Sequence, residues 1–253
     1  MVRKLRRIAR QIWALLYYGV LCYVVDRPKR VAFINSVLAF HERDRLAPRF
    51  PSLEFSEIFR VSSELKVSLD GYTVGEGKIS FPEFATLAAI VRVCDPVLIF
   101  EFGTGDGTTT LQFAKHSRPD AEVYTIDLPP ASPRPRLATD PGDRMLIGRK
   151  DVGIRFRATP FERKIHQLLE DSALLDTQNL RNQVNLVFID GAHSYEYASN
   201  DTAKALEMVA PGGTIVWHDY MVWNQVTDFL NELSHKLPLR HIKGTSLVVY
   251  RHP

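Results

Sequence analysis

Short apolar segments alternate with amphipathic stretches along the chain from Val97 onward. The apolar runs occur at 97–102, 122–126, 184–189, 213–217 and 246–250. Helical candidates lie between several of these runs, and the stretch 81–93 also has helical apolar spacing, with Pro82 near its start. Strands separated by helices predict an α/β fold in which a mainly parallel sheet carries helices on both faces.

The pattern before this region divides the chain into three parts. Residues 1–30 are predicted to form a basic and apolar N-terminal helix, residues 31–75 a lead-in of mixed helix and loop, and residues 76–253 the main domain. Within the first part, an uncharged run extends from Ile12 to Val25. At fourteen residues, it falls short of the roughly 20 residues that a helix needs to cross a bilayer.

Charge is distributed unevenly along the chain. The net charge is +3, but residues 1–30 hold eight Lys or Arg and one acid, whereas the remainder holds 24 basic and 28 acidic residues. The basic balance therefore belongs to the N-terminus and does not indicate a nucleic-acid partner. The two cysteines, Cys22 and Cys94, cannot form a disulfide framework and fit a reducing, cytoplasmic location.

Three alternatives stand for residues 1–30. The segment is a helix packed on the main domain or on a second subunit of a homo-oligomer, a helix lying on an anionic membrane at its cytoplasmic face, or a true span. Basic residues flank the apolar run on both sides, so they do not indicate an orientation in a membrane.

A glycine-rich segment carries the strongest chemical signal. The run Glu101-Phe-Gly103-Thr104-Gly105-Asp-Gly107 follows a predicted strand and precedes a helical candidate at 108–115. Strand, glycine turn and helix is an arrangement in which backbone closely approaches a nucleotide-like ligand. Asp127 ends the next apolar run, twenty-four residues after Gly103, about where a ribose-binding acid is expected. These features predict a cofactor-binding enzyme.

Two further acids follow later apolar runs. Asp190 comes after 186–189 and Asp219 after 214–217. If these strands are neighbours, the carboxylates converge at the edge of the sheet that faces the ligand, although Asp219 could simply end its strand. His193 and His218 are candidates for a general base, because an ordinary histidine pKa lies near 6.5. Each of them could instead have only a structural role.

Four segments occur in the order found in one enzyme family: Glu101–Gly107, Asp127, Phe188-Ile-Asp-Gly-Ala-His-Ser-Tyr195 and Pro211-Gly-Gly-Thr-Ile-Val-Trp-His-Asp-Tyr220. With them, residues 76–253 resemble class I S-adenosylmethionine-dependent methyltransferases. The similarity is greatest to the group with an Asp-Gly-x-His-x-Tyr motif, which is related to macrocin-type sugar O-methyltransferases and cephalosporin-hydroxylase-like proteins. The resemblance implies a Rossmann-like, doubly wound sheet with an antiparallel closing strand.

The resemblance also implies site residues. The implied cofactor-binding residues belong to the glycine turn, to the end of the next apolar run and to the segment after Gln167-Leu-Leu-Glu170: Glu101, Gly103, Thr104, Gly105, Gly107, Asp127, Asp171 and Ser172. The last two match a pair that contacts adenine, although Asp171 could serve only as a helix cap. The implied catalytic residues are Asp190, His193 and His218. The implied ligands of Mg²⁺ or another divalent cation are Asp190, His218 and Asp219, with His218 standing where some relatives have an acid.

The expected reaction is S-adenosylmethionine-dependent O-methylation of a hydroxyl on a sugar, a glycan precursor of polysaccharide biosynthesis, or a small natural product. One alternative is an NAD-dependent oxidoreductase, although its G-x-G-x-x-G pattern is not what stands at 103–107. Another is a non-catalytic membrane-surface subunit that retains the cofactor fold.

Two regions have open interpretations. Residues 128–164 hold six of the fifteen prolines, and form either a solvated loop or a loop that borders the substrate. The aromatic residues Trp217, Tyr220 and Trp223 either line the acceptor pocket or belong to the core.

Overall fold

The structure is a computed structural model that describes residues 48–253 except 62–63, 74–77, 131–133 and 146. The helix predicted at 1–30, with its membrane or subunit contacts, and the first part of the lead-in lie outside the described residues. Residues Pro48–Pro253 form one compact unit. Among the helices that the structure describes, none is both long and apolar enough to cross a bilayer.

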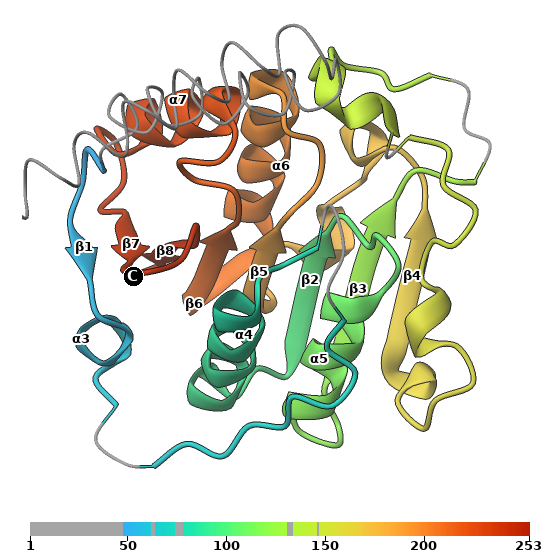
Figure 1. The fold of residues 1–253 in the computed structure, drawn as a ribbon, viewed down its shortest axis with the longest axis horizontal. Coiled ribbons are helices and arrows are strands. Elements are labelled where there is room, and N and C mark those ends of the chain that lie inside the picture. The colour runs from blue at the N-terminus through green and yellow to red at the C-terminus, as the bar shows by residue number, and fades with distance from the viewer. Residues whose placement is uncertain (1–47, 62–63, 74–77, 131–133, 146) are drawn as a thin grey trace, which may run out of the picture. The chain divides into compact units, whose positions relative to one another are not determined.

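An eight-stranded sheet forms the centre of this unit, with the strand order β1-β7-β8-β6-β5-β2-β3-β4 (Figure 1). Its strands are β1 (Ser52–Leu53), β2 (Leu98–Phe102), β3 (Glu122–Asp127), β4 (Ile165–Leu169), β5 (Val184–Ile189), β6 (Val209–Trp217), β7 (Arg240–Ile242) and β8 (Val248–Arg251). All pairings are parallel except those of β8 with β6 and β7. The doubly wound, mainly parallel fold with an antiparallel closing strand is therefore confirmed.

Three short strands, β1, β4 and β7, were not expected from the apolar runs. β1 comes from the predicted lead-in and pairs with β7, whereas β4 pairs with β3 at the other edge of the sheet. The side chains of β4 are only half buried or exposed, because an edge strand has a neighbour on one side. Strands of this kind lack the continuous apolar run that marks a central parallel strand.

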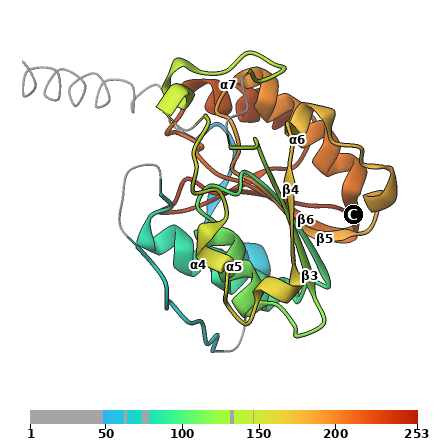
Figure 2. The same ribbon diagram turned by 90° about the vertical axis from the view of Figure 1, so that its right-hand side faces the viewer.

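Helices cover both faces of the sheet. They are α3 (Phe55–Phe59), α4 (Phe81–Cys94), α5 (Thr108–His116), α6 (Tyr195–Met208) and α7 (Asn224–Leu233). α4 and α5 lie on one face, and α6 and α7 on the other (Figure 2). Short 3₁₀ turns occur in the connections: η1 (Pro141–Met145), η2 (Ile154–Phe156), η3 (Glu162–Lys164), η4 (Ser172–Leu174) and η5 (Gln178–Leu180).

Successive residues of the central strands enter two separate cores. In β2, Ile99 packs with Leu87 of α4 in one cluster, whereas Phe100 belongs to the cluster that contains Met208 of α6. Side chains alternate between the two faces of a strand, and here both faces are covered. This explains why the central strands read as continuous apolar runs.

The start of α4 is tied to a distant part of the chain. Ser80 and Glu83 form a capping box, in which Ser80 N donates to Glu83 Oε2 at 3.1 Å. The other carboxylate oxygen of Glu83 accepts hydrogen bonds from the backbone N and the Oγ of Ser246, both at 2.7 Å. Glu83 therefore joins α4 to the segment that leads into β8.

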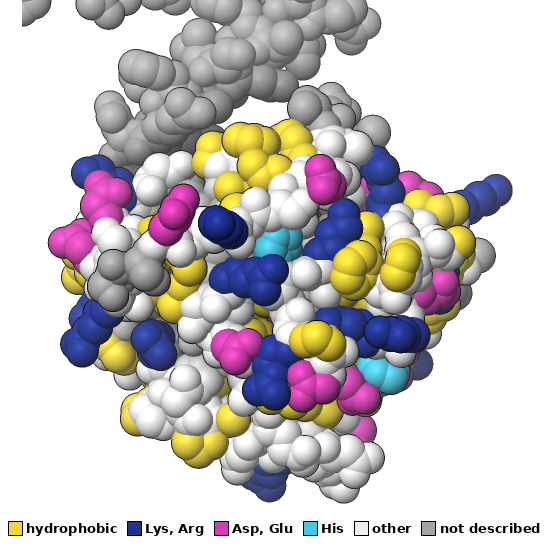
Figure 3. All heavy atoms as spheres, turned by 90° about the horizontal axis from the view of Figure 1, so that it is seen from below, with side chains coloured by type: hydrophobic (Ala, Val, Ile, Leu, Met, Phe, Trp, Pro, Cys, Tyr) yellow, Lys and Arg dark blue, Asp and Glu magenta, His cyan; other side chains and the backbone are white. Residues whose placement is uncertain are grey.

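The end of the sheet seen from below is a surface of mixed charge. Figure 3 shows lysine and arginine side chains there, interspersed with acidic and apolar ones. The parallel strands β2, β3 and β4 point away from this surface (Figure 1). Their carboxyl ends, where ligands bind in parallel sheets, therefore lie at the opposite end of the molecule.

Replacing Gly103 by alanine should destabilise the fold strongly. The residue has φ +91°, and a Cβ there would lie 2.0 Å from the carbonyl oxygen of Asp190. We expect the free energy of unfolding to fall by more than about 3 kcal/mol, because left-handed strain and overpacking add. Gly244→Ala is the control, since Gly244 has φ +81° and no atom within 4 Å of a Cβ. It should lose only about 1–2 kcal/mol in urea denaturation, and equal losses would contradict this account.

Candidate active site

A cavity of about 450 Å³ lies at the carboxyl ends of the central strands. Most charged side chains in its wall are acidic: Asp106, Asp127, Asp143, Glu170, Asp171, Asp190, Asp201 and Asp219. Among the described residues of the wall, Lys78 and Arg149 are the lysine and arginine side chains. This excess of carboxylates favours ligands that carry positive charge.

The glycine turn forms the floor between β2 and α5. Gly103, Gly105 and Gly107 have φ values of +91°, +52° and +87°, which favour glycine. A Cβ on Gly107 would lie 2.7 Å from the ring of Phe156, so the backbone passes closely beneath that side chain. No atom lies within 4 Å of a Cβ on Gly105, which lines the cavity. The turn therefore packs tightly against the protein and exposes backbone to the ligand.

Asp127 lies beside this turn at the end of β3. Its Oδ2 accepts a hydrogen bond from the backbone N of Gly105 at 2.8 Å, and its Oδ1 accepts one from Leu128 N at 2.7 Å. Burial raises the pKa of the Asp127 carboxyl. Because Asp127 and the glycine turn both line the cavity, the structure brings the predicted ribose acid and the predicted turn to one site.

Glu101 lies behind the turn and is not among the residues that line the cavity. Its fully buried carboxyl accepts hydrogen bonds from Thr110 and Thr125, and Thr125 Oγ1 lies 2.8 Å from that of Thr104, which does line the cavity. Burial raises the pKa of Glu101 to about 8, despite these hydrogen bonds. The prediction that Glu101 contacts the cofactor is therefore corrected: its side chain supports the turn from beneath.

Asp171 and Ser172 line the cavity at the start of η4. Asp171 caps this turn by accepting a hydrogen bond from Ala173 N at 2.9 Å, and it accepts another from Arg136 N at 2.7 Å. The hydroxyl of Tyr197 donates to the same carboxylate at 2.8 Å. Asp171 is thus a cap that also lines the cavity, and its contact with adenine stays a prediction.

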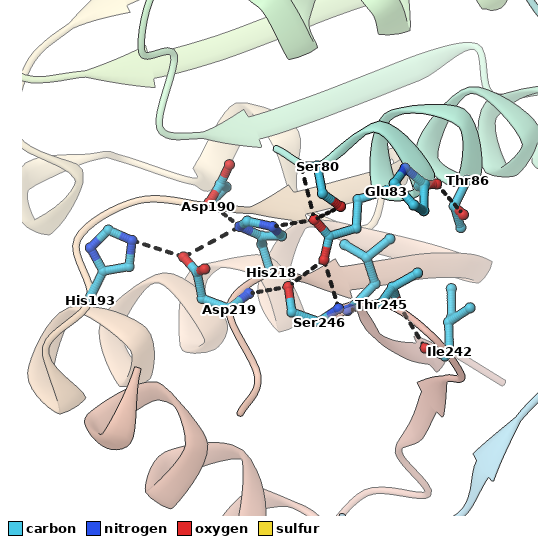
Figure 4. A network of polar contacts seen from close by, with 12 residues as sticks. Ser80, Glu83, Thr86, Asp190, His193, His218, Asp219, Ile242, Thr245 and Ser246 are labelled. Atoms are coloured by element: carbon cyan, nitrogen blue, oxygen red, sulfur yellow. Dashed lines mark hydrogen bonds and ion pairs between the residues drawn. The ribbon is translucent and has the colours of Figure 1, made fainter. Parts of the chain in front are cut away.

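Asp190 and Asp219 converge from the ends of β5 and β6, as predicted from their positions after two apolar runs. His218 joins them, since its Nδ1 lies 2.9 Å from Asp190 Oδ1 and 3.3 Å from Asp219 Oδ2 (Figure 4). His193 approaches from the segment after β5, with its Nε2 2.8 Å from Asp219 Oδ2. Acids and imidazoles therefore alternate across this side of the cavity.

His218 has a carboxylate at each ring nitrogen. Its Nε2 lies 3.4 Å from Glu83 Oε2, on the side opposite Asp190 and Asp219. Burial lowers the pKa of His218, but the charges of Asp190 and Asp219 outweigh this effect and hold the pKa well above its ordinary value. Burial would likewise raise the pKa of Glu83, but hydrogen bonds from His218 and Ser80 lower it. His218 is therefore an imidazolium held within a carboxylate network.

His193 is fixed in the same way by the long loop before β4. Its Nδ1 bonds to the carboxylate of Asp143 in η1, and its backbone N donates to Asp143 Oδ2 at 3.1 Å. Its ring stacks on Trp223 with centroids 4.2 Å apart. Burial lowers the pKa of His193, but the hydrogen bonds to Asp143 and Asp219 raise it to about 10.

These contacts bear on two predictions, the general base and the metal ligands. The carboxylates hold the pKa of both histidines above its ordinary value, which disfavours either one as a general base near neutral pH. Three donor atoms that could hold a metal, all within 4.8 Å of one another, come from Asp190, His193 and Asp219. His193, and not the predicted His218, belongs to this set, although carboxylates engage both ring nitrogens of each histidine.

The aromatic residues predicted to lie in the acceptor pocket or in the core are Trp217, Tyr220 and Trp223, and the structure places them in different surroundings. Trp223 lines the main cavity. Trp217 and Tyr220 are almost fully buried, and their polar atoms bond internally, to Thr202 and Asn231 respectively, at 2.8 Å each. Core packing therefore accounts for these two.

The loop 128–164 borders the cavity. It contributes Asp143, Arg149 and four less polar residues to the wall, and its Gly153 N donates to the carbonyl oxygen of Gly105 at 3.0 Å. The interpretation as a loop beside the ligand is therefore favoured over a purely solvated one.

Comparison with known proteins agrees with this geometry. Residues 100–220 match the family described as a methyltransferase domain. Over the region that holds the glycine turn, Asp127 and Asp190, the chain is therefore similar to a methyltransferase domain. This similarity disfavours the oxidoreductase alternative. Among curated proteins, no sequence match was found.

Solved structures support the same fold. One of them is the O-methyltransferase TomG from Streptomyces achromogenes, which is involved in tomaymycin synthesis and was solved with S-adenosylmethionine. It superposes with a TM-score of 0.51 and 16% identity, over 71% of this chain and 84% of that one. An O-methyltransferase from Bacillus cereus, solved with S-adenosylhomocysteine, superposes with a TM-score of 0.50 and 13% identity. The match covers 70% of this chain and 84% of that one. At these identities the likeness concerns the methyltransferase fold.

The polar residues of the site that were not identified from the sequence include Lys78, Glu83, Asp143 and Tyr197. Glu83 had a detectable local signal, because Ser80 and Glu83 have capping-box spacing at the start of a helix. The other three carry no motif. Asp143 reaches His193 across fifty positions of sequence, so only the folded loop reveals it.

Glu101→Gln should remove a pH-dependent loss of stability. Because the folded state raises the pKa of Glu101 to about 8, the protonated form contributes stability below the unfolded pKa near 4.5, and that stability is lost as pH rises towards 8. The Gln variant mimics the protonated form. In denaturant titrations, its free energy of unfolding should exceed that of the wild type by an amount that grows to roughly 2–5 kcal/mol as the pH rises from 5 to 8.5. The exposed Glu64→Gln is the control, and parallel curves for all three proteins would rule out this explanation.

Asp143→Asn should lower the pKa of His193 from about 10 towards the ordinary value near 6.5, because a neutral amide replaces a carboxylate at Nδ1. Nitrogen chemical shifts of the imidazole, followed through a pH titration, measure this. Asp140→Asn is the matched control, since Asp140 lies on the same loop but bonds Gln225 and Gly142. A His193 pKa that stays near 10 in the Asp143 variant would show that Asp143 has no influence.

Proposed function

We propose that this protein transfers the methyl group of S-adenosylmethionine to a hydroxyl oxygen. One observation carries the proposal: the glycine turn with Asp127 and the cluster of Asp190, His193 and Asp219 line the same cavity. A donor held by the first group would present its sulfonium methyl to an acceptor held by the second. Positioning two reactants in this way can contribute about 7–11 kcal/mol to lowering the barrier.

The electrostatics of the cavity support a cationic donor. S-adenosylmethionine carries a sulfonium charge that is lost when its methyl group is transferred. The acidic side chains around the cavity stabilise that charge and also favour a neutral acceptor. A hydroxyl of a sugar, glycan precursor or small natural product meets this condition at the reacting end.

Asp190 is best placed to accept the proton of the acceptor hydroxyl. One of its oxygens bonds His218 Nδ1 at 2.9 Å, and the other points away from that ring (Figure 4). Burial raises the pKa of the Asp190 carboxyl, which strengthens it as a base. The His218 imidazolium holds the carboxylate in place, while His193, through its ion pair, holds Asp219.

The donor set also fits a divalent cation. Asp190, His193 and Asp219 would hold it through two carboxylates and one imidazole, a set that suits Mg²⁺, Mn²⁺ or Fe²⁺. His193 would have to release its Nε2 proton on binding, while Asp143 would keep the other ring nitrogen protonated. Such an ion would supply Lewis-acid stabilisation of the alkoxide.

Asp190→Asn should abolish methyl transfer while leaving donor binding largely intact. We expect at least about a 100-fold loss of kcat, because the proton acceptor is removed. The assay follows labelled methyl from S-adenosylmethionine into sugars, glycan extracts and hydroxylated natural products, with and without Mg²⁺ or Mn²⁺. Binding of S-adenosylhomocysteine is measured by calorimetry.

The exposed Asp120→Asn serves as the control, because Asp120 pairs with Arg118 on the surface and does not line the cavity. Undiminished turnover by the Asp190 variant would refute the proposed site. Absence of heat with S-adenosylhomocysteine in the wild type would refute the donor.

A further inference from the structure

The residues of the cavity wall fall into groups according to the strand that precedes them. Asp127 and Asp171 lie beyond β3 and β4, whereas Asp190 and Asp219 lie beyond β5 and β6. The turn after β2 lies between these two groups, because β2 separates β3 from β5 in the sheet. A third part of the wall, on the side of α4 and α5, has no ligand assigned so far.

This third part contains Tyr72, Thr73, Lys78, Thr108 and Thr109. Lys78 lies just before the start of α4, and its side chain is 24% exposed. Its Nζ donates to Thr73 Oγ1 at 2.7 Å and to Asp106 Oδ2 at 2.8 Å. An ammonium group has three N–H donors, so these two described partners leave one for a ligand in the cavity.

Lys78 is also the cation best able to bind an anionic group here. Arg149 is the other lysine or arginine among the described residues of the wall, and its Nε and Nη2 donate to the two carboxylate oxygens of Asp151 at 3.0 and 2.9 Å. That bidentate pair engages one edge of the guanidinium, whereas Lys78 lies beside the start of α5. In a cavity with so many acids, a carboxylate on the ligand needs a cation close to it.

A second feature near Lys78 also favours an anion. The nine-residue helix α5 begins at Thr108, and Thr108 and Thr109 both line the cavity. The first backbone N–H groups of a helix carry partial positive charge and lack partners within the helix. Thr108 N is engaged by Asp106 Oδ1 at 3.1 Å, and Thr109, whose N–H has no partner within the helix, follows it in the wall. Lysine and helix start thus face the same part of the cavity.

We propose that Lys78, with the start of α5, binds the carboxylate of the amino-acid end of the donor. This inference rests on the proposed function, and it adds a residue that determines specificity. A donor whose adenosine lies beyond β3 and whose sulfonium faces Asp190 directs its amino-acid end over the glycine turn towards α4 and α5. Lys78 then distinguishes donors that carry this carboxylate from nucleosides that lack it.

The test compares three ligands by calorimetry: S-adenosylhomocysteine, its decarboxylated analogue, and 5′-methylthioadenosine, which lacks the amino acid. The wild type should bind the first at least about 10-fold more tightly than the second. Lys78→Met should weaken S-adenosylhomocysteine binding by about 10- to 100-fold, as expected for a hydrogen bond to a charged group. Its affinity for the other two ligands should change by less than about 3-fold.

Arg155→Met provides a matched control. Arg155 contacts the same two partners as Lys78, with Nη2 3.0 Å from Thr73 Oγ1 and Nε 3.4 Å from Asp106 Oδ2, but it does not line the cavity. If these contacts only fasten the wall, Arg155→Met and Lys78→Met should affect all three ligands alike. That result would overturn the assignment of Lys78.

The outcomes separate the two proposals. A wild type that binds none of the three ligands would overturn the proposed donor. A wild type that binds S-adenosylhomocysteine no better than its decarboxylated analogue would overturn only the assignment of Lys78, even if the Met variant failed to fold. Lys78→Arg, which keeps the charge, should retain most of the preference for the carboxylate.

Discussion

The backbone contact between the glycine turn after β2 and the end of β5 governs the arrangement of the site. Gly103 lies so close to the carbonyl of Asp190 that no side chain fits between them. Parallel pairing of β2 with β5 produces this approach, since both strands end at the same edge of the sheet. The donor-binding turn and the proposed proton acceptor are consequently held in a fixed relation by backbone atoms.

The charged side chains around that contact stabilise one another, because carboxylates surround each of the two histidines. Asp190, Asp219 and Glu83 surround His218, while Asp143 and Asp219 flank His193. A buried charge costs several kcal/mol unless it is paired, and here each imidazolium lies between carboxylates. The same pairing makes the histidines poor bases, so the proposed proton transfer falls to a carboxylate whose other oxygen points away from the network.

Connecting segments complete the cavity by binding to the glycine turn. Gly153 and Arg155 of the long loop donate backbone hydrogen bonds to the carbonyls of Gly105 and Asp106, at 3.0 and 2.9 Å. Lys78, before α4, reaches the carboxylate of Asp106. The turn therefore organises both the loop and the lead-in, which explains how irregular segments provide an ordered wall for the ligand.

The sequence alone determined the mainly parallel fold, the glycine turn, Asp127 and the pair Asp190 and Asp219, because buried strands and the residues at their ends leave a local pattern. It also indicated the family through the order of its motifs. Tertiary structure decided that Glu101 lies beneath the turn, that His193 lies with Asp190 and Asp219 in the cluster of candidate metal donors, and that Asp143 and Lys78 join the site. Charge states and contacts between residues of different elements depend on packing and burial, which no local pattern of residues encodes.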